Sequence, residues 1–350
     1  MKKKSILITG ITGNAGKNAA KYFLKKGYEV TGFSRNATKD PFFKENNIVV
    51  YDLDLLAFIK QEQKIPFTEA NMVYHTAAYV LGKTREEKEI MRKINVDATL
   101  KLYSWAIDAG VKDFVFLSSV SIYDYPFKNK PIREDHPKKP RYFYAKTKLE
   151  AETKLLALYE SVVKKEKVPK LSILRPCYIV GRDDRNFAPQ FIGRLLREDL
   201  PMIGNGNNLM SFVHSKDLAK ATLVVIDRDS QKPEDFNVVS FTKTFYEFFK
   251  PFADYFKVKF PSKKYPYWLA YIAGVIIQTY KKMVGKDPSL GISTYRVKTL
   301  STDRIYDTEK IEKLGYKPEF NYHTVFEEIL QDIKEHPNRY GLLFNKTQPI

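Results

Sequence analysis

Apolar and polar positions follow a regular alternation of short and long segments over the first half of the chain. Short runs without polar alternation, such as Ile6–Thr9, are each followed by a longer segment of helical periodicity. Strands that are apolar on both faces are typical of a parallel sheet whose crossover helices cover both sides. We therefore predict an α/β fold with a doubly wound parallel sheet. The expected strands are Ile6–Thr9, Glu29–Phe33, Asn47–Tyr51, Val73–Thr76, Phe114–Ser118 and Leu171–Leu174, and the expected helices are Ala15–Lys26, Ile94–Ala109 and Tyr144–Tyr159.

The alternation loosens after Gly181. We expect residues 181–335 to form mainly a smaller, discontinuous C-terminal region that binds the substrate, and residues 336–350 to form an extended tail. Short strands are expected near Ser211–Val213 and Phe236–Val239, and helices near Ala188–Arg197, Trp268–Met283 and Tyr322–Lys334.

Three glycines, Gly10, Gly13 and Gly16, separate the first strand from the first helix. Glycines let the backbone approach a pyrophosphate, whose charge is favoured by the free N–H groups of a helix N-terminus. An ordinary strand-to-helix turn is the alternative, but the position between a strand and a helix favours a dinucleotide site. We therefore predict that residues 1–180 form a Rossmann domain, whose sheet is completed by segments within residues 210–240.

The end of the second strand indicates which nicotinamide cofactor is preferred. Dinucleotide folds that prefer NAD usually place an acidic residue there to hold the ribose hydroxyls. This chain has Ser34 and Arg35 instead, and a guanidinium suits a 2′-phosphate. We predict NADP as the preferred cofactor and NAD as the alternative, unless Arg35 simply faces solvent. Asp52, followed by Leu53, would accept a hydrogen bond from adenine or cap the next helix.

Tyr144 and Lys148 stand four residues apart, and therefore on one face of a predicted helix. An adjacent ammonium and an oxidised nicotinamide would together lower the pKa of the phenol and make it a general acid or base. Tyr142 and Lys146 have the same spacing, so spacing alone does not choose between the two pairs.

A series of short motifs lies between about residues 5 and 220. The motifs are Thr9-Gly-Ile-Thr-Gly-Asn-Ala-Gly16, Asp52-Leu53, His75-Thr-Ala-Ala78, Asn95-Val96, Ser118-Ser-Val-Ser-Ile-Tyr123, Tyr144-Ala-Lys-Thr-Lys148, Leu174-Arg-Pro176, Gly204-Asn-Gly206 and Phe212-Val-His-Ser-Lys-Asp217. In their order they resemble the extended short-chain dehydrogenases/reductases of the NAD-dependent epimerase/dehydratase superfamily. Two positions depart from the pattern: Asn14-Ala15 replaces a bulkier pair, and Asp124 stands where glycine is common.

The resemblance implies the roles of the site residues. The family pattern Tyr-x-x-Ser/Thr-Lys fits Tyr144 and Lys148, and it implies Ser119 as the catalytic hydroxyl, with Ser118 and Ser121 as alternatives. The cofactor-binding residues are then expected to be Gly10, Thr12, Gly13, Asn14, Ala15, Gly16, Ser34, Arg35, Asp52, Leu53, Thr76, Ala77, Ala78, Asn95, Ser118, Tyr144, Lys148, Pro176 and Ile179.

Other residues that often carry chemistry are expected to be structural. His75 and His214 match supporting positions, and Cys177 is expected to be a small packing residue rather than a nucleophile. The five histidines show no paired ligand spacing, so we expect no metal site.

The implied chemistry is the interconversion of a secondary alcohol and a ketone. Ser119 would bind the substrate oxygen, Tyr144 would pass the proton and Lys148 would hold the ribose, while the nicotinamide carries hydride. Val120 replaces the acidic residue that a dehydratase would use. The apolar segment 266–277 resembles the 3β-hydroxysteroid dehydrogenase branch, including reductases of long-chain 3-oxo acids, and indicates an apolar, lipid- or steroid-like substrate. A nucleotide-sugar 4-epimerase and a non-catalytic NADP-sensing or nucleic-acid-binding protein are the alternatives.

Composition and charge limit the partners. With 43% hydrophobic residues the chain is globular, and its net charge of +18 favours anionic partners. The lysines are dispersed, so we do not expect nucleic acid. The single cysteine and the lack of a signal-peptide apolar region indicate the cytoplasm. The lysine-flanked segment 266–282 would touch a membrane surface peripherally or cover the substrate pocket. By analogy a homodimer would form through helices near residues 95–109 and 144–159.

Overall fold

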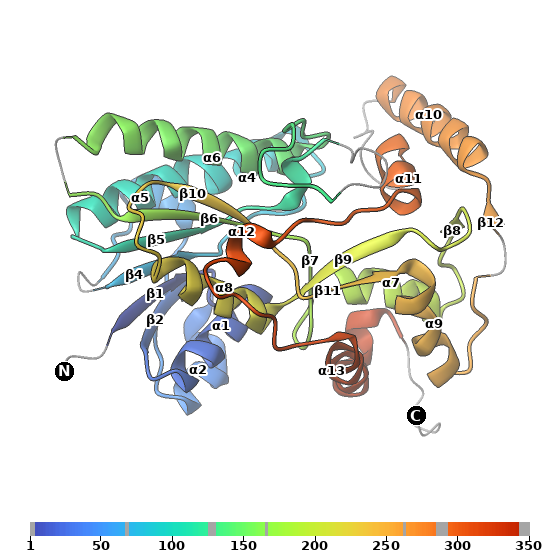
Figure 1. Cartoon of the computed structure of the whole chain (residues 1–350), viewed down its shortest axis with the longest axis horizontal. Coiled ribbons are helices and arrows are strands. Elements are labelled where there is room, and N and C mark those ends of the chain that lie inside the picture. The colour runs from blue at the N-terminus through green and yellow to red at the C-terminus, as the bar shows by residue number, and fades with distance from the viewer. Residues whose placement is uncertain are drawn as a thin grey trace.

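A seven-stranded, wholly parallel sheet forms the centre of the larger lobe (Figure 1). The computed structural model describes residues 4–66, 70–124, 131–164, 167–261, 264–284 and 293–342, with only the backbone of Tyr295 and Arg296. The strand order is β10-β6-β5-β4-β1-β2-β3, which is the order of a Rossmann sheet and confirms the predicted doubly wound fold. The strands are β1 (Ser5–Thr9), β2 (Glu29–Ser34), β3 (Val49–Asp52), β4 (Met72–His75), β5 (Asp113–Leu117), β6 (Lys170–Pro176) and β10 (Glu234–Val238).

Helices cover both faces of this sheet, because its strands are apolar on both faces. Figure 1 shows α4, α5 and α6 on one face and α1, α2 and α8 on the other. Each face has its own apolar core, one formed with α1 and α8, the other with α5 and α6. The larger lobe contains helices α1 (Asn14–Lys25), α2 (Pro41–Glu45), α3 (Leu55–Ile59), α4 (Arg85–Arg92), α5 (Ala98–Asp108), α6 (Phe143–Val162), α8 (Ser215–Ile226) and α12 (Glu309–Glu312).

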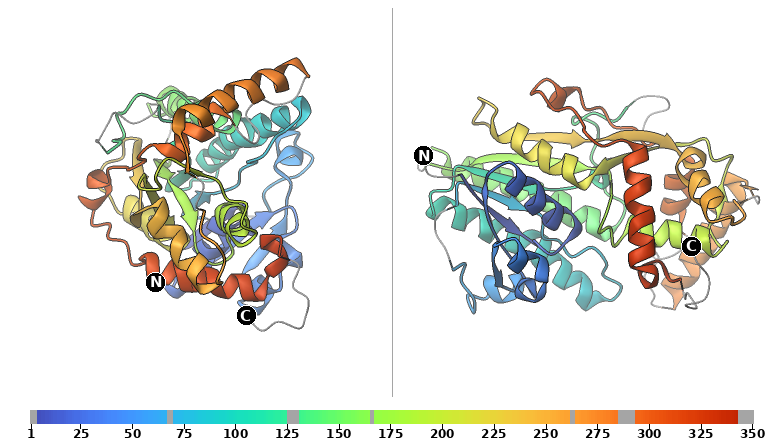
Figure 2. Two further views of the ribbon diagram at one scale, coloured as in Figure 1. Left: turned by 90° about the vertical axis from the view of Figure 1, so that its right-hand side faces the viewer. Right: turned by 90° about the horizontal axis from the view of Figure 1, so that it is seen from below.

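The smaller lobe is built mainly from residues after Pro176 and lies beside one end of the sheet (Figure 2). Its three-stranded sheet has the order β11-β9-β7, and a third core rich in phenylalanine joins it to α7, α9 and α13. Its elements are β7 (Tyr178–Val180), α7 (Phe187–Leu196), β8 (Met202–Ile203), β9 (Leu209–His214), β11 (Phe241–Thr244), α9 (Phe245–Tyr255), β12 (Lys264–Tyr265), α10 (Tyr267–Met283), α11 (Thr294–Ser301) and α13 (Tyr322–Glu335).

Three local features differ from the sequence-based expectations. The helix expected over Ile94–Ala109 begins with a π-turn, Lys93–Asp97, which continues from α4 into α5. Thr244 and Glu247 form a capping box that starts α9, a helix the apolar pattern did not reveal. The tail is not extended at its start, because Pro337–Tyr340 forms a short 3₁₀ helix whose last residue is buried against α7. Residues 343–350 lie outside the described part of the chain.

A buried ion network ties the last strands of the large sheet to helix α6. The guanidinium of Arg175 on β6 is 1% exposed and donates to both carboxylate oxygens of Glu152 on α6, at 3.0 and 2.8 Å. It also donates to the hydroxyl of Tyr123 at 2.8 Å and pairs with Asp235 on β10. Helix α6, which carries the predicted pair Tyr144 and Lys148, is therefore fixed to β6 and β10.

Candidate active site

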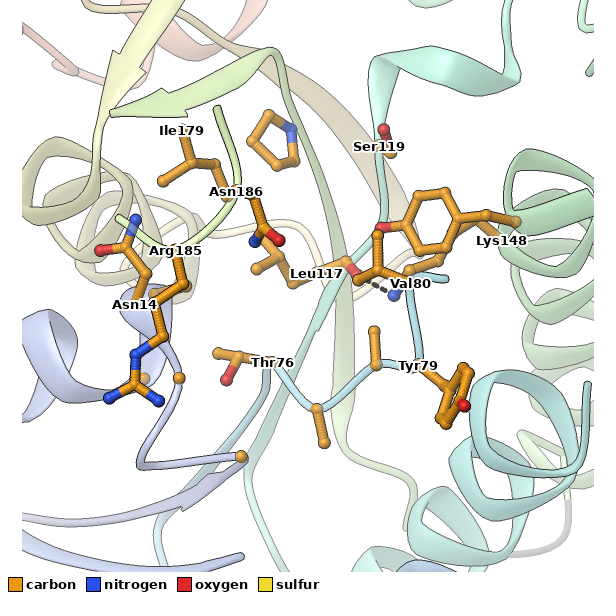
Figure 3. Close-up of a pocket in the computed structure, with 18 of the residues that line it drawn as sticks. Asn14, Thr76, Tyr79, Val80, Leu117, Ser119, Lys148, Ile179, Arg185 and Asn186 are labelled. Carbon is orange, nitrogen blue, oxygen red and sulfur yellow. Dashed lines mark hydrogen bonds between the residues drawn. The ribbon is translucent and has the colours of Figure 1, made fainter. Parts of the chain in front are cut away.

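A cavity of about 920 Å³ lies at the carboxyl ends of the central strands, where ligands bind in doubly wound sheets. Its size is at the upper end of the range for small-molecule and cofactor sites. All of the predicted catalytic and cofactor-binding residues line it except Asp52 and Asn95. Figure 3 shows Ser119 and Lys148 on one side of this cavity and Asn14 and Arg185 on the other.

The glycine loop forms a cradle that only glycine permits. Gly10 has φ of +67°, and a Cβ atom there would lie 2.8 Å from the Cα atom of Ala77. A Cβ atom on Gly16 would lie 2.4 Å from the carbonyl oxygen of Gly10. Gly13, the N-cap of α1, has no side chain to bond the first-turn N–H groups. Those N–H groups and the tight turn fit a dinucleotide pyrophosphate.

The end of the cavity beside β2 has a basic and hydroxylic rim. The Ser34 and Thr12 hydroxyl oxygens lie 3.0 Å apart, and the exposed side chain of Arg35 lines the cavity next to them. The acidic side chains that also line this end are engaged elsewhere. Asp40 accepts from Lys17 Nζ at 2.8 Å and caps α2, and Asp54 caps α3.

Asp52 does not reach the cavity. Its carboxylate accepts hydrogen bonds from the backbone N–H of Thr38 at 2.9 Å and from the Thr38 hydroxyl at 2.5 Å. These bonds lower the pKa of Asp52. The expected contact with adenine is therefore replaced by a bond that holds the turn after β2. Leu53, the next residue, does line the cavity. The partner that holds Asp52 away from the cavity is Thr38, fourteen residues earlier in the sequence.

Lys148 is the buried cation of the site. Its side chain is 1% exposed, and its Nζ atom donates to the carbonyl oxygen of Leu117 at 2.7 Å (Figure 3). The Nζ atom lies 5.9 Å from the centre of the Tyr144 ring. The competing Lys146 is exposed and does not line the cavity, although Tyr142 stacks on Tyr144 with 6.2 Å between ring centres. The structure thus places Lys148, and not Lys146, inside the cavity.

The protonation states of this pair differ from the expectation. Burial lowers the pKa of Lys148 to about 7, against the opposing effect of Glu152. Burial raises the pKa of Tyr144 above the ordinary value of a phenol. The protein's own groups therefore keep Tyr144 protonated, and the lowered phenol pKa would require the charge of an oxidised nicotinamide.

Three serine hydroxyls follow β5 and line the cavity. The Oγ atom of Ser119 accepts from the backbone N–H of Ser121 at 3.2 Å, which leaves its proton available to a substrate oxygen. The buried Oγ atoms of Ser118 and Ser121 have no hydrogen-bond partner among the described residues. A buried hydroxyl without a partner is costly, so these two are further candidates for ligand contact.

Asn95 is a positioning residue and not a wall of the cavity. Its side-chain amide bonds both the N–H and the carbonyl of Tyr79, at 2.8 and 2.9 Å, and donates to the Thr147 hydroxyl at 2.9 Å. Thr147 in turn donates to the carbonyl oxygen of Tyr144 at 2.7 Å. The π-turn carrying Asn95 therefore joins the loop after β4 to the start of α6. The predicted cofactor contact of Asn95 is replaced by this indirect role.

His75 and Cys177 are placed as structural residues. The ring nitrogens of His75 are hydrogen-bonded to the hydroxyls of Thr9 and Thr99, at 2.6 and 2.8 Å. Burial lowers the pKa of His75 to about 3, so the ring is neutral. Cys177 lines the cavity, but burial raises the pKa of its thiol, which opposes formation of a nucleophilic thiolate.

His214 is also held within the fold. Its Nε2 atom lies 2.8 Å from a carboxylate oxygen of Glu328 on α13, and its ring accepts from the Lys216 N–H at the start of α8. Within the described ranges, no group of three His, Cys, Asp or Glu side chains is arranged to hold a metal ion.

The smaller lobe adds wall residues that the sequence did not reveal, among them Arg185, Asn186, Ser211, Arg304 and Tyr306. Asn186 is held by Asp184, whose carboxylate accepts the backbone N–H groups of Asn186, Phe187 and Ala188 at the start of α7, and Arg185 lies between these two residues. An aspartate four residues before the predicted helix Ala188–Arg197 was the available signal for this loop. The others come from β9 and from the chain that bridges to it after α11.

Residues 6–238 match the family model described as the NAD dependent epimerase/dehydratase family. The chain is 24% identical over 335 residues to the mouse sterol-4-alpha-carboxylate 3-dehydrogenase, decarboxylating, covering 91% of this chain and 87% of that protein. It is 31% identical over 205 residues to UDP-glucose 4-epimerase from Vibrio cholerae, covering 57% and 58%. The structure of UDP-glucuronic acid 4-epimerase from Bacillus cereus in complex with NAD matches 95% of this chain and 99% of that chain, with a TM-score of 0.69 at 19% identity.

Proposed function

The chain belongs to the NAD-dependent epimerase/dehydratase family, and on that premise we propose that it interconverts a secondary alcohol and a ketone on an apolar, lipid- or steroid-like substrate, with NADP(H) as the preferred cofactor. The observation that carries this proposal is the meeting of Ser119, Tyr144 and Lys148 in one cavity with the glycine loop. The family membership and the sterol dehydrogenase relative support an NAD-dependent enzyme of the extended short-chain dehydrogenase type. The substrate and the cofactor preference are the proposed part.

The side chains divide the reaction between them. When bound, the nicotinamide would supply hydride to the carbonyl carbon or accept it from the alcohol carbon. In the reducing direction, Ser119 donates a hydrogen bond to the carbonyl oxygen, and Tyr144 gives its phenolic proton to that oxygen as it becomes the alcohol. Lys148, with a pKa of about 7, exchanges protons readily near neutral pH and restores the phenol. One solvent proton is consumed for each ketone reduced.

The rim beside β2 supports the choice of NADP(H). Arg35 is exposed at the cavity, and Ser34 and Lys39 line the same end. A guanidinium and an ammonium there would bond a 2′-phosphate, whereas Asp40 and Asp54 are committed to helix caps and to Lys17.

The apolar side chains of the cavity wall support an apolar substrate. The wall includes Val80, Cys177, Ile179, Phe187 and Tyr306, all apolar or aromatic. The sterol dehydrogenase relative, which aligns over nine-tenths of the chain, favours the same substrate class.

A nucleotide-sugar 4-epimerase is the second candidate, because Arg185 and Arg304 line the same cavity. Two guanidinium groups would suit the diphosphate of a nucleotide sugar. The UDP-glucose 4-epimerase relative aligns over 57% of the chain. We rank this candidate second because the sterol dehydrogenase relative aligns over 91% of the chain.

The first experiment tests the cofactor by titrating the protein with NADPH and NADH in parallel and following nicotinamide fluorescence. Arg35→Ala should weaken NADPH binding about tenfold or more, the loss of a charge-assisted hydrogen bond, and leave NADH binding within about twofold. Arg133→Ala, an exposed arginine outside the cavity, is the matched control. Equal affinity for both cofactors in the wild type would refute the NADP(H) preference, and binding of neither would favour the non-catalytic alternative.

The second experiment tests the substrate. Wild-type protein and Tyr144→Phe are assayed for NADPH oxidation with 3-oxosteroids and long-chain 3-oxo acids, and separately for conversion of UDP-glucose to UDP-galactose. Turnover of an apolar ketone that Tyr144→Phe abolishes supports the proposal. Epimerisation of the nucleotide sugar without ketone reduction would replace it with the second candidate.

A further inference from the structure

Helix α10 packs on the rest of the protein along one narrow face. Gly274 is its only fully buried residue, and a Cβ atom there would lie 3.0 Å from the backbone nitrogen of Thr294 at the start of α11. Gln278, one turn further on, accepts from the Thr294 hydroxyl at 2.8 Å. These residues, four apart, mark the covered side of the helix. The remainder of α10 lies at the outside of the molecule, away from the large sheet (Figures 1 and 2).

The opposite side of α10 is apolar and exposed. The helix has no charged residue between Tyr267 and Tyr280, and its outward side chains are large. A contiguous exposed apolar surface of this kind marks an interaction site in a protein that is otherwise well packed. The exposed fractions are 62% for Trp268, 45% for Leu269, 48% for Ile272, 43% for Val275, 63% for Ile276, 61% for Tyr280 and 81% for Met283.

The charged residues that flank this apolar face in the sequence between Asp254 and Asp287 are all lysines. The sequence from Tyr255 to Lys286 contains seven lysines and no acidic residue. Among them, Lys264 precedes α10 and is exposed, and Lys281 and Lys282 lie in its last turn. An apolar helix face between clusters of lysine matches the boundary between acyl chains and anionic headgroups. An apolar protein partner would account for the face but not for the one-sided charge.

We propose that α10 lies flat on an anionic membrane surface, with Trp268, Ile272 and Ile276 in the acyl boundary and the flanking lysines at the lipid phosphates. The helix would lie on the bilayer and not cross it, because no described helix is long and apolar enough to span a membrane. This inference rests on the surface of α10 and does not depend on the proposed reaction.

The arrangement also links the membrane face to the cavity. Helix α11, on which α10 packs, is followed directly by the residues that bridge to β9, and Arg304 and Tyr306 of this segment line the cavity. The helix pair therefore connects the proposed membrane face to one wall of the site.

The chain supplies its own probe for a test, because Trp105 and Trp268 are its only tryptophans. In Trp105→Phe, all tryptophan emission comes from α10. The full-length protein is titrated with vesicles of phosphatidylcholine alone and with vesicles that also contain phosphatidylglycerol. We expect a blue shift of the emission and co-sedimentation with the anionic vesicles only, both weakened by high salt.

Three variants locate the contact. Ile272→Glu and Ile276→Glu should each reduce vesicle affinity about tenfold or more, because each removes the burial of one isoleucine and adds a repelled charge. The double change Lys281→Gln and Lys282→Gln should reduce it about 25-fold, at about fivefold per lysine. Val49→Glu, at a 54% exposed position on the edge strand β3, is the matched control and should change nothing. Far-UV circular dichroism and urea unfolding of every variant verify that the fold is intact.

Three results would overturn the proposal. The first is no binding to either vesicle, and the second is equal binding to neutral and anionic vesicles. The third is a dimer in light scattering that Ile276→Glu dissociates while vesicles leave the emission unchanged, which would assign the face to a second copy of the chain. All readouts are independent of turnover, so failure of the proposed reaction would not be mistaken for failure of this proposal.

Discussion

Replacing Lys148 by methionine should change the pH dependence of stability as well as remove activity. Lys148 is 1% exposed, and its Nζ atom has the Leu117 carbonyl as its protein hydrogen-bond partner. Methionine has a similar length and no charge, so the variant removes the buried ammonium with little change in packing. Turnover should fall sharply, because the phenol loses its proton exchange partner and the ribose its contact.

The magnitude follows from the lowered pKa of Lys148. Burial lowers it from 10.5 to about 7, and at about 1.4 kcal/mol per pH unit the cost of the buried charge is about 5 kcal/mol below pH 7. Between pH 7 and pH 10.5 the unfolded chain holds this proton and the native protein releases it, so stability rises with pH. From pH 7 to pH 9 the wild type should gain about 2 kcal/mol relative to Lys148→Met.

Urea unfolding of both proteins at pH 7, 8 and 9 measures this difference. The contributions of most other titrating groups to the unfolding free energy are the same in the wild type and in Lys148→Met, so they cancel in the difference. His75 titrates near pH 3, far below this range, and burial moves the pKa of Tyr144 upward, away from it. A difference in unfolding free energy that stays constant from pH 7 to pH 9 would refute the conclusion that Lys148 is desolvated in the native protein.

Three further substitutions have defined outcomes. Tyr144→Phe should lower turnover by about 10²–10⁴-fold while NADPH affinity, measured by fluorescence, stays within about twofold, because only the proton donor is lost. Arg175→Met should lower the free energy of unfolding by about 3–5 kcal/mol, because it leaves the 2% exposed Glu152 unpaired, and adding Glu152→Gln should recover part of the loss in urea unfolding. Gly16→Ala should weaken NADPH binding about tenfold or more in the same titration, since its Cβ atom would lie 2.4 Å from the Gly10 oxygen; an unchanged affinity would contradict the tight cradle.

The sheet could be predicted because its signals are local. A run such as Phe114–Ser118 has no polar alternation, and this alone distinguishes a strand buried on both faces. The predicted strands of the large sheet lie within one or two residues of those observed. The glycine loop could also be predicted, because its strand, its turn and the N-terminus of its helix follow one another directly in the sequence.

The parts of the site that escaped prediction depend on contacts between distant segments. Asn95 was expected at the cofactor, yet its amide is occupied by the backbone of Tyr79 and by Thr147, and no local pattern shows this. Arg304 and Tyr306 reach the cavity because the chain after α11 bridges to Met210 on β9 and to Ile132. The upward shift of the Tyr144 pKa could not be predicted from the sequence either. The spacing of Tyr144 and Lys148 shows that they are neighbours, but only the fold shows that both groups are desolvated.

The placement of β10 beside β6 has a consequence for how the protein is made. Residues 177–233 separate the two strands, and they build much of the smaller lobe before the large sheet receives its last strand. At a synthesis rate of about 5–20 residues per second, the nascent chain carries an unpaired β6 edge for several seconds. An open edge of this kind is a template for pairing with other chains. The sheet of the dinucleotide-binding lobe therefore cannot be completed until the first part of the smaller lobe, from β7 to β9, has been synthesised.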